Sequence, residues 1–135
     1  MKRSRNKLVN QIFKLIIDVI IMKSSIADRY PIRVKFCKLD KKSLKKRNVY
    51  MDDSLGLTFE PRDKNGLKDA WLILIEHRIS KSLKGRVFLH EMLHILFWNE
   101  NRENPILKLE EIIWLELSED QKKFLIQIMY LLSKF

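Results

Sequence analysis

Two histidines and a glutamate have a spacing that suits metal chemistry. His90, Glu91 and His94 form the pattern His-Glu-x-x-His within the apolar run of residues 87–98. On an α-helix, residues four apart lie about 40° apart around the axis, one turn above the other, so both imidazoles can reach one tetrahedral zinc ion. Glu91 projects from the flank of that face, where it could accept a proton from a zinc-bound water. The spacing predicts a hydrolytic zinc site with two histidine ligands and a glutamate base.

A purely structural role for these residues is the alternative. The helix would then be buried, and its histidines would bond to backbone groups or to water. Burying two imidazoles and a carboxylate in an apolar helix is costly unless a partner compensates them. A metal ion supplies such a partner, so the zinc interpretation is favoured.

Length, composition and cysteine content limit the class of protein. The chain has 135 residues, of which 46% are hydrophobic, and this is enough for one domain, residues 1–135, with a substantial core. Its single cysteine, Cys37, excludes an intramolecular disulfide and a zinc site built from cysteines. Cys37 lies in a sequence typical of a buried strand and suits a reducing compartment, so we expect a cytoplasmic protein.

Positive charge is concentrated in the first third of the chain. Residues 1–50 contain 15 lysines and arginines against 3 acidic residues, whereas residues 51–135 contain 12 against 14. A basic surface can attract nucleic acid, anionic lipid or an acidic protein, and a solvated basic face without a partner is the alternative. The cluster of residues 41–47 is too polar to bury and is expected in a loop. The metal-binding pattern lies in the near-neutral remainder.

The N-terminal segment predicts an amphipathic helix over about residues 7–23. Lys14 and Asp18 interrupt its apolar run, and no cleavage site of small residues follows, which argues against a secretory signal. The run also falls short of the roughly 18 uncharged residues that a membrane span needs. We expect the helix to pack on the core, and a helix on a membrane surface is the alternative. The expected inward residues are Leu8, Ile12, Leu15, Ile16, Val19 and Ile20.

Three short segments are typical of strands. Residues 30–37 alternate apolar and polar side chains, and residues 55–59 form a short segment that is closed by a turn-rich stretch. Residues 70–75 are apolar enough for the central strand of a sheet. His77 follows this strand, and we expect it at the surface or the strand end. Help in polarising a substrate is its alternative role.

Capping residues indicate where the later helices begin. Ser80 and Ser82 are candidate N-caps for the helix that carries the metal-binding pattern, and the polar stretch 99–105 ends it. Ser118 and Gln121 have the spacing of a capping box, which predicts a closing helix. The expected inward residues of that helix are Phe124, Leu125, Ile128, Met129, Leu131 and Leu132. The predicted fold is α+β: an N-terminal helix, a small twisted three-stranded sheet, the helix with the pattern and a closing helix.

A third zinc ligand is expected downstream of the pattern. A catalytic zinc ion usually has three protein ligands and keeps a fourth position for water. The remaining histidine precedes the pattern, so an acidic residue is the better candidate. Glu119 is favoured because it opens the closing helix, where a carboxylate is rigidly placed and is stabilised by the helix dipole. A contact with that dipole alone, without a metal, is its alternative role. Glu111 is the second choice. The full set of candidates is Glu110, Glu111, Glu116, Glu119 and Asp120.

From about residue 55 to its end, the chain resembles the ImmA/IrrE family, and most closely its short phage-encoded members. The likeness lies in the order of strand, turn, strand, Leu-His-Glu-x-x-His and an acid-led amphipathic helix that ends in Met-Tyr-Leu-Leu. That family comprises small zinc metallopeptidases of phages, integrated elements and bacteria, and it implies a zincin-like fold. Two histidines and a later glutamate bind zinc there, and the glutamate of the pattern is the general base. The matching positions are His90, His94, Glu119 and Glu91.

The resemblance implies hydrolysis of a peptide bond in a cytoplasmic regulatory or repressor protein. Two other functions stay open. One is a catalytically silent metal-binding module that partners a DNA-binding repressor. The other is a basic protein that binds nucleic acid through residues 1–50, and its affinity would fall steeply with salt. A metal assay and a salt titration distinguish these functions from peptide hydrolysis.

Overall fold

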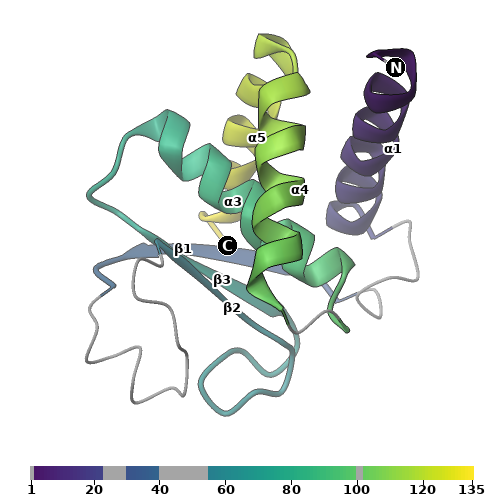
Figure 1. The fold of residues 1–135 in the computed structure, drawn as a ribbon. Coiled ribbons are helices and arrows are strands. Elements are labelled where there is room, and N and C mark those ends of the chain that lie inside the picture. The colour runs from purple at the N-terminus through teal and green to yellow at the C-terminus, as the bar shows by residue number, and fades with distance from the viewer. Residues whose placement is uncertain (1, 23–29, 40–54, 100–101) are drawn as a thin grey trace.

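The computed structural model describes residues 2–22, 30–39, 55–99 and 102–135. These residues form an α+β fold with four helices and a small three-stranded mixed sheet. Figure 1 shows the helices gathered on one side of the sheet. The elements in chain order are α1 (Lys2–Ile20), β1 (Ile32–Cys37), β2 (Gly56–Phe59), β3 (Trp71–Glu76), α3 (Lys81–Leu96), α4 (Glu103–Glu116) and α5 (Glu119–Leu132).

The sheet has β3 at its centre, as the apolar sequence predicted. β1 pairs with β3 in parallel and β2 pairs with it antiparallel, in the order β1-β3-β2. Side chains alternate along β3, so Ile73 and Ile75 enter the main core with the helices. Leu74 points to the other face, where it forms a small buried cluster with Leu57 and Phe59. The three predicted strands are thus confirmed.

α3 is the central helix and is buried on most sides. It contacts α1, α4, α5, β2 and β3, and a helix with apolar residues all round is expected in such a position. The Ser80 hydroxyl caps its start by accepting a hydrogen bond from the backbone N–H of Leu83 at 3.2 Å. At Gly85, an added Cβ would lie 2.6 Å from Ile126 Cγ1, so the glycine lets α3 and α5 approach closely. α3 therefore holds the histidines between the sheet and α4.

α4 was not predicted from the sequence, which indicated three helices and none between residue 99 and the closing helix. Pro105 was interpreted as part of a helix end, but it lies in the first turn of α4. Its missing N–H removes no helical hydrogen bond there. Leu107, Ile112 and Leu115 are exposed on this helix, so apolar residues on several sides obscure its periodicity. The correction matters because α4 packs against α3.

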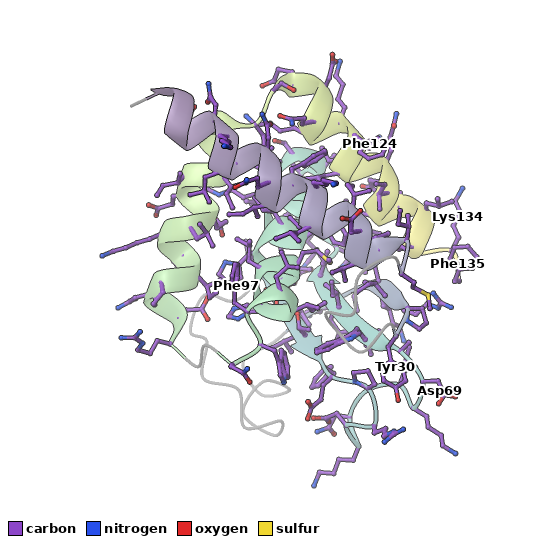
Figure 2. All side chains as sticks on the ribbon, turned by 90° about the vertical axis from the view of Figure 1, so that its right-hand side faces the viewer. Tyr30, Asp69, Phe97, Phe124, Lys134 and Phe135 are labelled. Carbon is purple, nitrogen blue, oxygen red and sulfur yellow. The ribbon has the colours of Figure 1, made fainter. Side chains whose placement is uncertain are left out.

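The predicted N-terminal and closing helices are present as α1 and α5, although α1 begins at Lys2 and ends at Ile20 instead of spanning residues 7–23. Some of their side chains also point away from the core. Leu8 and Leu15 of α1 and Phe124 and Leu131 of α5 were expected in the core and are exposed instead. Figure 2 shows Phe124 beside α1, where its ring lies 6.2 Å from that of Phe13, centroid to centroid. The buried residues of the two helices are Val9, Ile12, Ile16, Val19, Leu125, Met129 and Leu132. The capping box of Ser118 and Gln121 is present as predicted.

The predictions for Cys37, for the basic cluster and for a membrane span have different outcomes. Cys37, expected to be buried, is only partly buried at the end of β1. The basic cluster of residues 41–47 lies outside the described residues. Within the described ranges, none of the helices combines the length and the apolar character required to cross a membrane.

Glu76, the last residue of β3, is a buried carboxylate surrounded by donors. The backbone N–H groups of Leu39 and Arg78 donate to it at 3.2 and 3.0 Å. The Arg78 guanidinium forms an ion pair with it at 2.5 Å, and Nδ1 of the half-exposed His77 lies 3.1 Å away. The Arg78 hydrogen bond, helped by the backbone donors and opposed by burial, holds the pKa of Glu76 well below its usual value.

Glu76→Gln should lower the free energy of unfolding at pH 7 by about 1–3 kcal/mol, because it removes a charged acceptor from buried donors. A depressed pKa in the folded state stabilises the protein above the unfolded-state pKa, which is near 4.5, and this contribution is lost as the pH falls through the folded-state pKa. Urea unfolding at pH 7 and pH 3 measures the difference. It should be smaller at pH 3, and an equal difference at both pH values would contradict this account.

Candidate metal centre

α3 and α4 place basic and acidic side chains against each other in register. Arg86, His90 and His94 are four residues apart on α3, whereas Glu103 and Glu110 are seven apart on α4. Both spacings are close to whole helical turns, so each set lies on one face. Glu110 contacts Arg86 and His90, and Glu103 contacts His90 and His94. The two helices therefore run antiparallel, with each carboxylate between two bases.

Two imidazole nitrogens face the two oxygens of the Glu103 carboxylate. Nε2 of His90 and Nε2 of His94 are 3.1 Å apart. Oε1 of Glu103 lies 2.5 Å from Nε2 of His90, and Oε2 lies 3.2 Å from Nε2 of His94. Oε1 is buried, and despite this short contact it accepts no hydrogen bond of normal geometry from the part of the chain that the structure describes. A buried oxygen of this kind calls for an explanation, and a cation shared with the two imidazoles provides one.

The donor set fits a zinc ion. Two imidazole nitrogens and a carboxylate oxygen are zinc ligands, and bond lengths near 2.0–2.1 Å in a tetrahedron put neighbouring ligand atoms about 3.3 Å apart. The observed separations of 3.1 and 3.2 Å match this value. The other Glu103 oxygen, Oε1, lies only 2.5 Å from Nε2 of His90, so binding requires the Glu103 carboxylate to move outward. Its side chain is 36% exposed and has room to do so.

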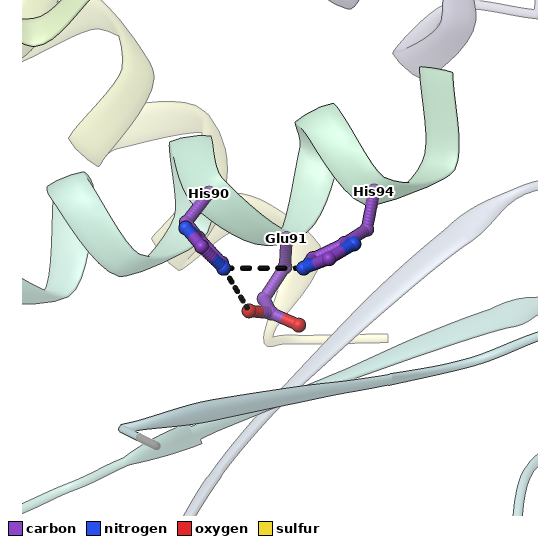
Figure 3. Close-up of side chains that lie close together, drawn as sticks. All are labelled: His90, Glu91 and His94. Atoms are coloured by element: carbon purple, nitrogen blue, oxygen red, sulfur yellow. Dashed lines mark hydrogen bonds and ion pairs between the residues drawn. The ribbon is translucent and has the colours of Figure 1, made fainter. Parts of the chain in front are cut away.

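Glu91 lies beside the two histidines, between α3 and β2. One ligand atom from each of His90, Glu91 and His94 fits within a group of 4.8 Å. Figure 3 shows both imidazoles on one side of α3, with the Glu91 carboxylate next to their facing nitrogens. Its Oε2 lies 4.0 Å from Nε2 of His90. The hydroxyl of Thr58 on β2 donates to its Oε1 at 2.9 Å, so the carboxylate has a fixed direction.

The second ring nitrogen of His90 also has a partner. Its Nδ1 lies 2.9 Å from Oε1 of Glu110, and Nε of Arg86 donates to Oε2 of the same carboxylate at 2.6 Å. Burial acts to raise the pKa of Glu110, but the hydrogen bonds from His90 and Arg86 outweigh it and hold the pKa below its usual value. Glu110 is therefore ionised at neutral pH and accepts hydrogen bonds with both oxygens.

Burial and neighbouring charges shift the other pKa values in different directions. Burial raises the pKa of Glu91 to about 7, although His90 and the Thr58 hydroxyl oppose the shift. Burial also holds the pKa of His94 below its usual value, with Glu103 opposing and His90 reinforcing the shift. Burial acts downward at His90 too, but its hydrogen bond to Glu110 and the nearby carboxylates raise the pKa overall. His94 is thus kept neutral, the form that binds a metal.

The structure does not bring Glu119, the predicted third ligand, to the histidines. Its side chain is 83% exposed and pairs with Lys122 at 3.5 Å. Figure 1 shows the α4–α5 turn at the end of these helices that points away from the sheet. Glu111 and Asp120 are exposed, and Glu116 ends α4. Glu110 is the one earlier candidate in contact with a histidine, through Nδ1 of His90.

Glu103 is the site residue that sequence reasoning missed. It was placed in a polar stretch that ends the preceding helix, but it opens α4. Two signals could have indicated it. Pro105 is typical of a first helical turn, and a helix that begins there puts Glu103 on the same face as Glu110, two turns earlier. Comparison of the chain with protein-family models, curated proteins and solved structures finds no match.

Proposed function

We propose that this chain is a zinc-dependent metallopeptidase with a single zincin-like domain, in which His90, His94 and Glu103 hold the ion. The observation that carries the proposal is that two imidazole nitrogens face the Glu103 carboxylate, His90 at its buried Oε1, which accepts no hydrogen bond of normal geometry from the described residues, and His94 at its Oε2. Glu103 takes the place that the family resemblance gave to Glu119. The donor set of two histidines and a glutamate occurs in catalytic zinc sites.

Glu91 is proposed as the base. A zinc ion at this site would supply Lewis acidity, because it polarises a carbonyl group and lowers the pKa of a water molecule. Glu91 would take the proton from the attacking water and pass it to the nitrogen of the departing amine. Its position supports this role, since Thr58 fixes Oε1 while Oε2 lies on the side of His90. Cleavage of a peptide bond in a cytoplasmic regulatory protein is proposed on the family resemblance.

Peptide hydrolysis by zinc-loaded protein tests this proposal. A mixed library of unstructured, internally quenched peptides should be cleaved, and a chelator should stop cleavage until zinc is restored. His94→Ala, prepared in the same way, should be inactive. Cleavage that survives both the chelator and His94→Ala would contradict the proposal. A zinc-loaded protein that cleaves no peptide would favour the silent metal-binding module instead.

Gly56→Ala should impair hydrolysis while sparing the metal. An alanine Cβ at this position of β2 would lie 2.6 Å from Val87 Cγ1 and 3.2 Å from Glu91 Cγ, so the strand must move away from α3. We expect a loss of about 1–3 kcal/mol in unfolding free energy from overpacking, and a fall of up to about 100-fold in kcat/KM as Glu91 is displaced. Zinc content should persist, because Glu103 approaches the histidines from α4. Full activity would contradict the placement of Glu91.

A further inference from the structure

We infer that Glu110 is a positioning residue, which holds His90 with Nε2 directed at the proposed metal site, and that Arg86 keeps Glu110 out of the ligand set. The inference rests on the proposed function for the identity of the metal ligands. The observations that support the role of Glu110 are its contacts with Nδ1 of His90 at 2.9 Å and with Nε of Arg86 at 2.6 Å.

The two carboxylates on this face of α4, Glu110 and Glu103, differ in their hydrogen-bond partners and in their exposure. Both oxygens of Glu110 are engaged, one by a histidine and the other by an arginine. Glu103 has a buried oxygen that accepts no hydrogen bond of normal geometry within the described residues. Glu110 is also the more enclosed, with a side chain that is 10% exposed against 36% for Glu103. A carboxylate that is held by donors at both oxygens is suited to orient a ligand, and one whose oxygens face the two ring nitrogens His90 Nε2 and His94 Nε2 is suited to share a metal with them.

The contact with Glu110 selects one form of the His90 ring. An ionised carboxylate can only accept, so Nδ1 of His90 carries the hydrogen and donates it to Oε1 of Glu110. Nε2 of the neutral ring then has its lone pair free, directed towards His94 and Glu103. Metal-binding histidines commonly donate their other N–H group to a carboxylate, which fixes both ring orientation and the nitrogen that binds. Without Glu110, the buried Nδ1–H would lose this acceptor.

Arg86 explains why Glu110 does not itself turn to the metal. It is one helical turn before His90 on the same face of α3, and its Nε holds the oxygen of Glu110 that His90 does not use. The guanidinium also balances the charge of this enclosed carboxylate. With Arg86 removed, that oxygen loses its donor, and Glu110 could enter the ligand set. Arg86 thereby preserves three protein ligands and an open position.

The first test needs no substitution of Glu110. In metal-free protein, at a pH high enough to deprotonate the His90 imidazolium, whose pKa is raised, ¹⁵N NMR of the imidazole rings should show neutral His90 as the Nδ1–H tautomer, with signals assigned through His77→Ala and His94→Ala. Finding the Nε2–H tautomer would overturn the inference. This measurement is independent of the proposed function, because it gives its answer even if the protein binds no zinc.

The second test is zinc affinity by competition with a chelator. Glu110→Ala should weaken binding by about 10–100-fold, as loss of such a partner typically does, and Glu110→Gln should weaken it less, because its amide oxygen can still accept from Nδ1. Glu111→Gln is the matched control, since it changes the neighbouring exposed glutamate of α4, and it should bind zinc like the parent. Equal affinity in Glu110→Ala and Glu111→Gln would overturn the role of Glu110.

The role of Arg86 has its own measurement. Cobalt-loaded Arg86→Gln should have a visible absorption spectrum that differs from the parent, because Glu110 can then join the ligands. Adding Glu110→Ala to this variant should remove that difference. An unchanged cobalt spectrum in Arg86→Gln would overturn the second part of the inference, whatever the result for Glu110. If the unsubstituted protein binds no zinc, in contrast, the proposed function is refuted.

Discussion

Glu103→Ala should weaken zinc binding by more than about 100-fold. Loss of a residue that only supports a metal ligand already lowers metal affinity by about 10–100-fold, and Glu103 is placed as a direct ligand. Glu119→Ala should bind zinc like the parent protein. Glu103 and Glu119 occupy the same position within their helices, because each is the first residue of its helix. They differ in surroundings, since Glu103 contacts both histidines whereas Glu119 is exposed and pairs with Lys122.

Competition with a chelator measures both affinities under the same conditions. Glu103→Gln is a useful companion, because it keeps the size of the side chain and should show an intermediate affinity. Thermal unfolding of the metal-free variants provides the folding control. A larger loss of zinc affinity in Glu119→Ala than in Glu103→Ala would contradict the packing of α4 against α3 and restore the ligand that the family resemblance implies.

Glu91→Gln should reduce the rate of peptide hydrolysis by about 10²–10⁴-fold, the usual contribution of a general base. The amide keeps the shape of the side chain and can still accept a hydrogen bond from Thr58, but it cannot take a proton from water. Zinc content should be unchanged, because Oε2 of Glu91 is 4.0 Å from Nε2 of His90 while Glu103 is closer. The variant should therefore separate metal binding from hydrolysis.

The measurement pairs hydrolysis of a cleaved library peptide with metal analysis of the same sample. Glu119→Gln is the matched control, since it makes the same chemical change on the surface and should leave both quantities as in the parent. Loss of zinc together with activity in Glu91→Gln would show that Glu91 is a ligand and not the base. Unchanged hydrolysis would remove it from the mechanism.

The parts of the site that could be predicted from sequence are those that depend on local geometry. His90, Glu91 and His94 are brought together by helical spacing alone, and the structure places them in one group. The caps at Ser80 and Ser118 are equally local, because each hydroxyl bonds to a backbone N–H three residues later. The central position of β3 followed from its continuous apolar sequence.

The third ligand depends on packing between helices, which spacing within one helix cannot supply. Glu103 reaches the histidines because α4 packs antiparallel to α3 with its first turn beside His94. Predicting that contact requires the start of α4, which was missed because Pro105 was interpreted as part of the end of the preceding helix and because exposed apolar residues obscure the periodicity of α4. A clear capping box marks the start of the helix that Glu119 opens, so Glu119 was predicted as the third zinc ligand. A well-marked helix start shows where a carboxylate is held, but not which residue it faces.

Zinc content of the protein purified without chelator tests the central claim most directly. Native mass spectrometry and elemental analysis should find about one zinc ion per chain in the parent, and almost none in the variant with both His90→Ala and His94→Ala. The expectation follows from the convergence of both imidazoles and Glu103 on one point. Stoichiometric zinc in the double variant, or no zinc in the parent even after zinc is added, would contradict the account.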